Sequence, residues 1–200
     1  MNIISNNCLG GFIYRDILKC EYQNPFIWTS IFPDTFNELL TNFERINFQN
    51  VKIVRDTIIS DNNYLTILDN KYKIYNSHIF LSKKDVVPRN AYDKVHVDWI
   101  NVYYNKPEEY ILSKFKNRTL RMDSDIRVCM YDANDYGFTI EDIKKIIQTC
   151  SIKKYRALIF TEKKFEESLE NIKIIQIKHV DPWIVNLYNN YMNEIMEFLK

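Results

Sequence analysis

Short apolar runs alternate with amphipathic stretches along most of this 200-residue chain. Three runs, at 126–131, 157–160 and 172–177, have the length and composition of buried strands. Amphipathic helices are predicted around them, at 33–42, 105–119, 139–150 and 183–199. This alternation predicts one α/β domain covering all 200 residues, three-layered and Rossmann-like, with a mostly parallel central sheet.

Residues 51–93 interrupt this rhythm and are predicted to form a β-rich insertion. Short runs rich in β-branched and aromatic residues occur in it, at 51–54, 64–68, 72–75 and 78–81. Asp and Asn clusters between them are turn signals, so we expect one strand followed by a small antiparallel insertion. The strongest strand signal follows at 95–104, where imperfect alternation indicates a strand covered on both faces.

The start of the chain reads as a strand, a polar loop and a helix. Ile3-Ile4 precedes the loop, a double glycine lies within it, and a helical pattern runs from Phe12 to about Lys19. In an α/β sheet such a junction lies at the carboxyl end of a strand, where ligands bind. Glycines permit close approach of a ligand, and the amides of a first helical turn suit an anion or an oxyanion. The residues predicted to bind substrate or cofactor here are Ser5, Asn6, Asn7, Gly10, Gly11 and Tyr14.

Cys8 lies in the same loop and has two interpretations. A helix N-terminus lowers the pKa of a thiol, so Cys8 is a candidate nucleophile that would take up an acyl group as a thioester. The alternative is a small, buried hydrophobic residue. The loop has neither the Gly-x-Gly-x-x-Gly spacing nor the lysine of a P-loop, so a standard dinucleotide or Walker-type site is not predicted.

Acidic and histidine side chains at other strands are further candidates. Asp132 and Asp135 follow the strand at 126–131, and Asp132 is a candidate for substrate binding or for a general base. His96 and Asp98, in the run at 95–104, are candidate catalytic bases as well. His96 alternates with apolar residues, so a hydrogen-bonded core histidine is the competing interpretation.

Basic residues crowd the last turns of the helix predicted at 105–119 and the residues just after it: Lys114, Lys116, Arg118 and Arg121. One interpretation is a solvated basic face that complements the negative end of the helix. The other gives Arg118 a role in clamping a phosphate or a sugar acid.

Composition narrows the class of protein. The chain has 27 Lys and Arg against 26 Asp and Glu, and no basic stripe with interleaved aromatic residues, so no nucleic-acid partner is expected. The four cysteines show no CxxC pairing, and the three histidines show no ligand spacing. We therefore expect free thiols in a reducing compartment and no metal site. No membrane span or signal peptide is evident, which favours a cytoplasmic protein. The oligomeric state is open.

Several segments together resemble one bacterial family. They are the Ser-Asn-Asn-Cys-x-Gly-Gly motif at 5–11, Asn24-Pro25, and the stretches 99–104, 116–122 and 154–161. The family comprises proteins of unknown function from capsule and exopolysaccharide gene clusters, labelled as exopolysaccharide biosynthesis proteins or acetyltransferases. This chain departs from the family pattern at Leu9, where Trp is usual, and at Tyr103, where His is common. If that His is catalytic in relatives, its role is lost here or falls to His96 or His78.

The resemblance implies a cytoplasmic enzyme of surface-glycan assembly. With the candidate residues, it favours acetyl transfer from acetyl-CoA to an amino or hydroxyl group of a nucleotide-activated or glycan-linked sugar. The transfer would pass through Cys8, or directly to the sugar with His96, Asp98 or Asp132 as the base. The alternatives are a nucleotide-sugar-dependent glycosyltransferase that uses Asp132 and Asp135, and a non-catalytic glycan-binding subunit.

Overall fold

The computed structural model describes most of the chain. The described residues are 1–27, 29–56, 63–76, 108–132, 137–165, 169–177, 187 and 189–200. Several sequence predictions lie outside them, namely the strand at 95–104, the run at 78–81 and the candidates His78, His96, Asp98 and Asp135.

A four-stranded parallel sheet forms the centre of the domain. Its strands, in spatial order, are β1 (Asn2–Ser5), β6 (Ile126–Tyr131), β7 (Arg156–Thr161) and β8 (Ile172–Gln176). Each neighbouring pair is parallel. The strands lie where the apolar runs predicted them, and the parallel central sheet is confirmed. Because β1 pairs directly with β6, the start of the chain lies beside residues more than 120 positions further on.

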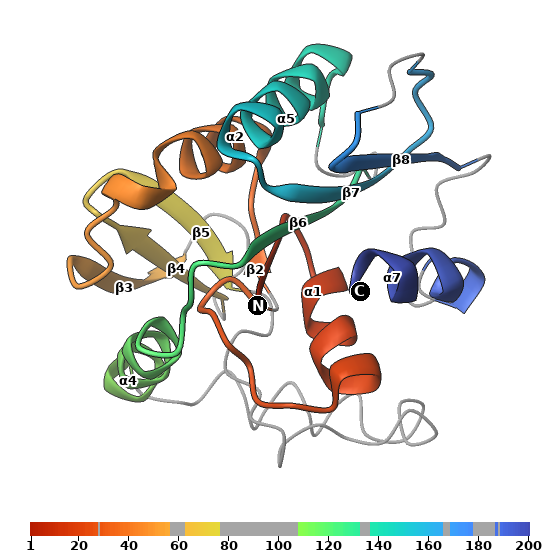
Figure 1. Ribbon diagram of the computed structural model, residues 1–200. Coiled ribbons are helices and arrows are strands. Elements are labelled where there is room, and N and C mark those ends of the chain that lie inside the picture. Colours follow the sequence, from red (N-terminus) through yellow and green to blue (C-terminus); the bar gives the residue numbers. More distant parts are fainter. Residues whose placement is uncertain are drawn as a thin grey trace.

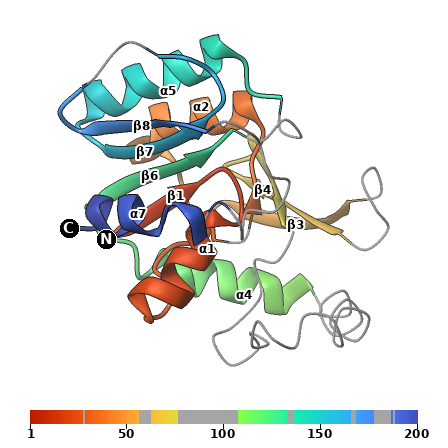
Figure 2. The ribbon, with the colours of Figure 1, turned by 90° about the vertical axis from the view of Figure 1, so that its right-hand side faces the viewer.

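Helices cover both faces of this sheet. Their bounds are α1 (Leu9–Phe12), continued by the π-helix η1 (Ile13–Leu18), α2 (Pro33–Asn42), continued by the 3₁₀ turn η2 (Phe43–Arg45), α4 (Glu108–Thr119), α5 (Ile140–Lys153) and α7 (Met192–Phe198). Helices α2 and α5 cover one face, whereas α1 and α7 cover the other (Figure 1, Figure 2). The result is the expected three-layer α/β architecture.

The last four residues of β6 show why the inner part of a central strand is apolar. Val128 and Met130 belong to the core under α2 and α5, and Cys129 and Tyr131 belong to the core under α1 and α7. Side chains of a strand alternate between faces, so a strand covered on both faces has no position left for solvated polar residues. The first polar residue after the strand, Asp132, marks its carboxyl end.

The predicted β-rich insertion supplies three strands of a second, antiparallel sheet next to α2 and α4, and the short strand β2 (Thr29–Ser30), which the sequence did not predict, adds a fourth from outside the insertion (Figure 1). The spatial order of this sheet is β2, β5 (Tyr72–Asn76), β4 (Asn63–Leu68) and β3 (Val51–Asp56). Asp69 and Asn70 link β4 to β5 with φ angles of +52° and +55°. Asn and Asp tolerate this left-handed region better than other side chains, which explains the predicted turn.

Helix α5 begins and ends at clear signals. The Thr139 hydroxyl accepts the Asp142 N–H at 3.2 Å, and the Asp142 carboxylate accepts the Thr139 N–H at 2.9 Å, which completes a capping box. The helix ends at Lys153, three residues after the predicted end near Cys150, because Lys154 adopts the left-handed conformation (φ +57°). The N–H of Tyr155 then satisfies the carbonyl of Cys150 at 2.9 Å.

Among the helices that the structure describes, each is too short or too polar to cross a lipid bilayer.

Candidate functional site

The polar loop after β1 is tied to the end of β6 through Asn6. The Asn6 Nδ2 donates to the carbonyl of Tyr131 at 2.9 Å, and the Tyr131 N–H donates to Asn6 Oδ1 at 3.0 Å. The fully buried Asn6 side chain thus makes the two hydrogen bonds that the backbone of a neighbouring strand would make, and extends the pairing of β1 with β6. The Asn6 side chain therefore fixes the N–H and the carbonyl of Tyr131, the residue directly before Asp132.

Asn7 strengthens the same connection. Its Nδ2 also donates to the Tyr131 carbonyl, at 3.2 Å, and its Oδ1 accepts the Leu9 N–H at 3.1 Å. The Ser5 hydroxyl donates to Asn7 Oδ1 at 3.3 Å. These contacts engage both side-chain amides inside the protein. Ser5, Asn6 and Asn7 therefore hold the ends of β1 and β6 together, and their predicted contact with substrate stays a prediction.

The two glycines lie inside helix α1, which corrects the prediction that they precede the helix. The helix begins at Leu9 because Asn7 Oδ1 accepts the Leu9 N–H. A Cβ atom at Gly10 would lie 3.2 Å from the Cβ of Ser5 and 3.6 Å from the carbonyl oxygen of Ile3. Gly10 therefore allows α1 to pack closely on β1, and Gly11 is buried in the same turn. The Leu9 amide, already bonded to Asn7, is not available to an anion.

The Cys8 thiol is shifted in the direction opposite to the sequence expectation. Cys8 is half-buried at the N-cap of α1, and burial raises the pKa of its thiol from 9.0 to about 12. Desolvation disfavours the charged thiolate and is the cause of the shift. The expectation of a lowered pKa is wrong, and a thiol in this environment is a weak nucleophile at neutral pH.

Alkylation of Cys8 by iodoacetamide is expected to be slow in the native protein and to accelerate with pH. The thiolate is the reacting form, and a pKa raised from 9.0 to about 12 reduces its population about a thousandfold at pH 7. Timed labelling and peptide mass spectrometry should show a rate that rises about tenfold per pH unit between pH 7 and 9. The denatured protein gives the reference rate. Labelling of native Cys8 as fast as in that reference would contradict the raised pKa.

Tyr14, another predicted site residue, lies at the outer edge of β1. Its hydroxyl accepts the Ile3 N–H at 3.1 Å and donates to the Met1 carbonyl at 2.8 Å. The Asn24 Nδ2 donates to the Ile3 carbonyl at 2.9 Å. Two buried side chains thus satisfy backbone groups that an edge strand would expose. The structure gives Tyr14 a role in closing this edge and does not bring its hydroxyl to the carboxyl end of the strand.

Arg118 is likewise separated from the strand ends. It is buried on α4, with its guanidinium 4.9 Å above the ring of Tyr22, and the Tyr22 ring meets that of Tyr14 edge to face at 6.3 Å. Burial lowers the pKa of Arg118 to about 10, so the guanidinium is still charged at neutral pH. Its stacking places Arg118 beside Tyr22 and Tyr14, and the clamp for a phosphate or a sugar acid stays a prediction.

Asp132 is the candidate that the structure favours. It is only 3% exposed, although it lies at the carboxyl end of β6. The Thr161 hydroxyl donates to Asp132 Oδ2 at 2.7 Å, and the Lys163 ammonium lies 2.5 Å from the same oxygen. No described residue donates to Oδ1. One oxygen of the carboxylate is thus anchored, and the other has no donor from the described part of the chain.

Thr161 and Lys163 were missed by the sequence analysis. They follow β7, which pairs with β6, so parallel pairing brings both to the strand end that carries Asp132. The Thr161 hydroxyl also accepts the Lys163 N–H at 3.1 Å, which orients the lysine. The sequence feature that could have indicated them is Thr161 at the end of the apolar run 157–160, followed two positions later by Lys163.

This arrangement is suited to accepting a proton. A carboxylate that is oriented through one oxygen presents the other in a defined direction, which is the geometry of a general base. Asn6 and Asn7 fix the backbone of Tyr131, and the Asp132 N–H donates to the Phe160 carbonyl at 2.9 Å. Within the described residues, no group of three His, Cys, Asp or Glu side chains is placed to hold a metal ion.

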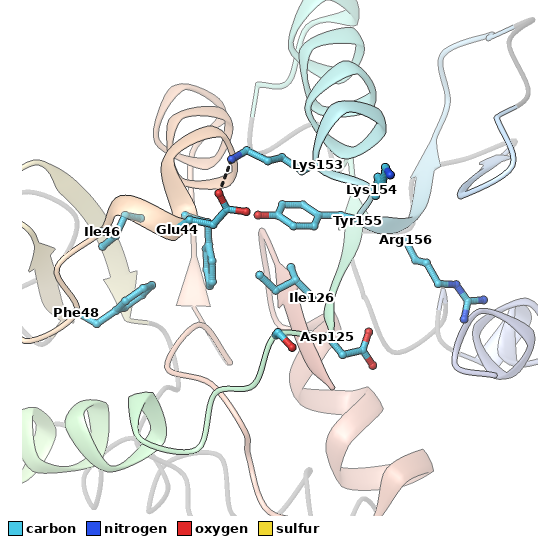
Figure 3. Close-up of a pocket in the computed structure, with 11 residues that line it drawn as sticks. Glu44, Ile46, Phe48, Asp125, Ile126, Lys153, Lys154, Tyr155 and Arg156 are labelled. Carbon is cyan, nitrogen blue, oxygen red and sulfur yellow. Dashed lines mark hydrogen bonds and ion pairs between the residues drawn. The ribbon is translucent and has the colours of Figure 1, made fainter.

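A cavity of about 700 Å³ lies at the opposite end of the parallel sheet. Its lining residues come from η2 and the residues after it, the start of β6, and the junction of α5 with β7 (Figure 3). Lys153 and Glu44 form an ion pair at 2.9 Å, and the Tyr155 hydroxyl points toward Glu44 (Figure 3). Burial and then the charge of Glu44 raise the pKa of Tyr155 to about 12. None of the predicted site residues lines this cavity.

The fold and the strand-end residues together define a three-layer α/β protein with a buried, oriented carboxylate at the carboxyl edge of its parallel sheet. The chain belongs to a family described as a domain of unknown function (DUF1919), whose sequence model matches residues 1–199. Comparisons with curated proteins and with solved structures gave no match.

Proposed function

We propose that the protein is a sugar acyltransferase. It would transfer an acyl group, in the simplest case acetyl from acetyl-CoA, to a nucleotide-activated or glycan-linked sugar of surface polysaccharide biosynthesis. The observation that carries the proposal is the buried Asp132 carboxylate, held through Oδ2 by Thr161 and Lys163. The choice of acetyl group and sugar is supported by the resemblance to proteins of capsule and exopolysaccharide gene clusters.

Direct transfer fits the chemistry of this site better than a covalent intermediate. The acceptor atom of the sugar attacks the thioester carbonyl carbon, Asp132 takes the proton of the acceptor, and the carbon–sulfur bond breaks to release the thiolate of CoA. Lys163 is 31% exposed, so its ammonium lies where it can stabilise negative charge beside Asp132. Cys8, with a thiol pKa of about 12, has no part in this route.

We also propose that the reaction takes place in the cytoplasm. All four cysteines are free thiols, as expected in a reducing compartment.

The test is mass spectrometry of reactions that contain the purified protein, acetyl-CoA and a panel of nucleotide-linked sugars. We expect an acetylated sugar, and a C8S variant that keeps turnover within about threefold of the wild type because a serine fills the same site. An acetyl adduct on Cys8, with loss of turnover in C8S, would replace direct transfer by the covalent mechanism.

Two other outcomes would overturn acyl transfer itself. Release of the nucleotide with transfer of the intact sugar would establish a glycosyltransferase. Sugar binding without turnover, unchanged by substitution of Asp132, would establish a glycan-binding subunit.

A further inference from the structure

We infer that the acceptor group is a hydroxyl and not an amine, so that the product is a sugar ester. This inference rests on the proposed function and specifies its substrate class. Three properties of the Asp132 cluster support it. They are the Oδ1 oxygen, to which no described residue donates, the charge of the cluster, and the role of Asp132 as a base.

Among the described residues, the hydrogen bonds of Asp132 involve only Oδ2 and leave Oδ1 open to a donor. Thr161 Oγ1 and Lys163 Nζ both bind Oδ2, and no described residue donates to Oδ1. A sugar hydroxyl carries one proton and matches this single acceptor. A protonated amine carries three N–H donors and needs further acceptors if it is to leave water without an unsatisfied group.

The charge of the cluster points the same way. Asp132 is almost fully buried, and the Lys163 ammonium already lies 2.5 Å from it, so the pair is close to neutral. An ammonium group at Oδ1 would be a second cation on one carboxylate, in a site where water screens the repulsion poorly. A neutral hydroxyl meets no such repulsion.

The need for a base completes the argument. A neutral amine is nucleophilic enough to attack a thioester first and lose its proton afterwards, whereas a hydroxyl must lose its proton as it attacks. The hydroxyl donates to Asp132 Oδ1, its oxygen bonds to the acyl carbon, its proton passes to Asp132, and the thiolate of CoA leaves. The proton then passes to the thiolate, so that the products are an ester and a free thiol.

The test compares matched acceptors that differ in one group, UDP-hexoses and the corresponding UDP-2-amino-2-deoxyhexoses, with acetyl-CoA as donor. We expect kcat/KM to be at least about tenfold higher for the hydroxyl acceptor. The product should release its acetyl group in alkaline hydroxylamine, which cleaves oxygen esters and leaves amides intact. An amide product, stable to hydroxylamine and formed from the amino sugars alone, would overturn the inference and leave acyl transfer standing. Absence of acetylation of every acceptor would overturn both proposals.

A K163M variant tests the charge argument. The measurement is the ratio of the rate on the amino sugar to the rate on the hydroxyl sugar, which a loss of stability alone does not change. Removal of the ammonium should raise the rate on the amino sugar relative to the hydroxyl sugar by at least about fivefold. An unchanged ratio in a folded K163M protein would show that Lys163 does not select the acceptor.

Discussion

Replacement of Asp132 by asparagine is expected to lower acyl-transfer turnover by about a hundredfold to ten-thousandfold, the usual contribution of a positioned general base. Asn has nearly the same shape as Asp, and its amide oxygen can still accept from Thr161. It cannot take up a proton at neutral pH, so the loss should appear in kcat. Steady-state kinetics of D132N with acetyl-CoA and the best acceptor measure the effect.

Asp125, directly before β6, provides a matched control. It lies just before β6 at the opposite end from Asp132, is half-exposed, and contacts Arg127 at 3.5 Å. Because exposed pairs of this kind contribute little, D125N should keep wild-type turnover and stability. If D132N retained more than about a tenth of wild-type kcat, Asp132 would not be the base, and direct transfer through this cluster would be excluded.

The strands of the central sheet could be predicted from the sequence because each is marked by a short run of neighbouring residues. The runs at 126–131, 157–160 and 172–177 are mostly apolar, and Arg127, Lys173 and Gln176 are their polar residues. Runs of this kind are typical of strands in a parallel sheet that is covered on both faces. The Asp69-Asn70 turn and the Thr139 cap were equally readable, since each rests on the conformational preference of a few neighbouring residues.

The candidate site could be predicted only in part, because it depends on contacts between residues that are far apart in the sequence. The sequence placed Asp132 at a strand end, but which polar side chains meet it depends on β6 pairing with β7. Asn6 and Asn7 look like loop residues until the pairing of β1 with β6 places Tyr131 beside them. Local composition likewise gave the wrong direction for the Cys8 pKa, since burial is set by the whole fold.

The Ser-Asn-Asn motif and the Asp132 cluster are therefore parts of one structural unit. The motif holds Tyr131 from one side, and Thr161 and Lys163 hold Asp132 from the other. The distinctive residues of the loop need not touch substrate to matter for catalysis, because the direction of the Asp132 carboxylate depends on the backbone before it.

Replacement of Asn6 by alanine is expected to destabilise the fold by about 2–4 kcal/mol. Both hydrogen bonds to Tyr131 disappear, and the buried N–H of Tyr131 is left without its acceptor. The carbonyl of Tyr131 keeps one donor, Asn7, so the cost should fall mainly on the N–H. Urea unfolding of wild type and N6A at pH 7 measures the difference in free energy of unfolding.

Asn42 is a suitable control for the loss of an asparagine amide. Its Nδ2 donates to the Glu38 carbonyl at 2.9 Å on the exposed side of α2, where water can replace it. N42A should change stability by no more than about 0.5 kcal/mol. N6A should also lose more turnover than its folded fraction explains, because the backbone before Asp132 is no longer held. Equal stability and equal turnover of N6A and N42A would show that the Asn6–Tyr131 pairing neither stabilises the sheet nor orients the carboxylate.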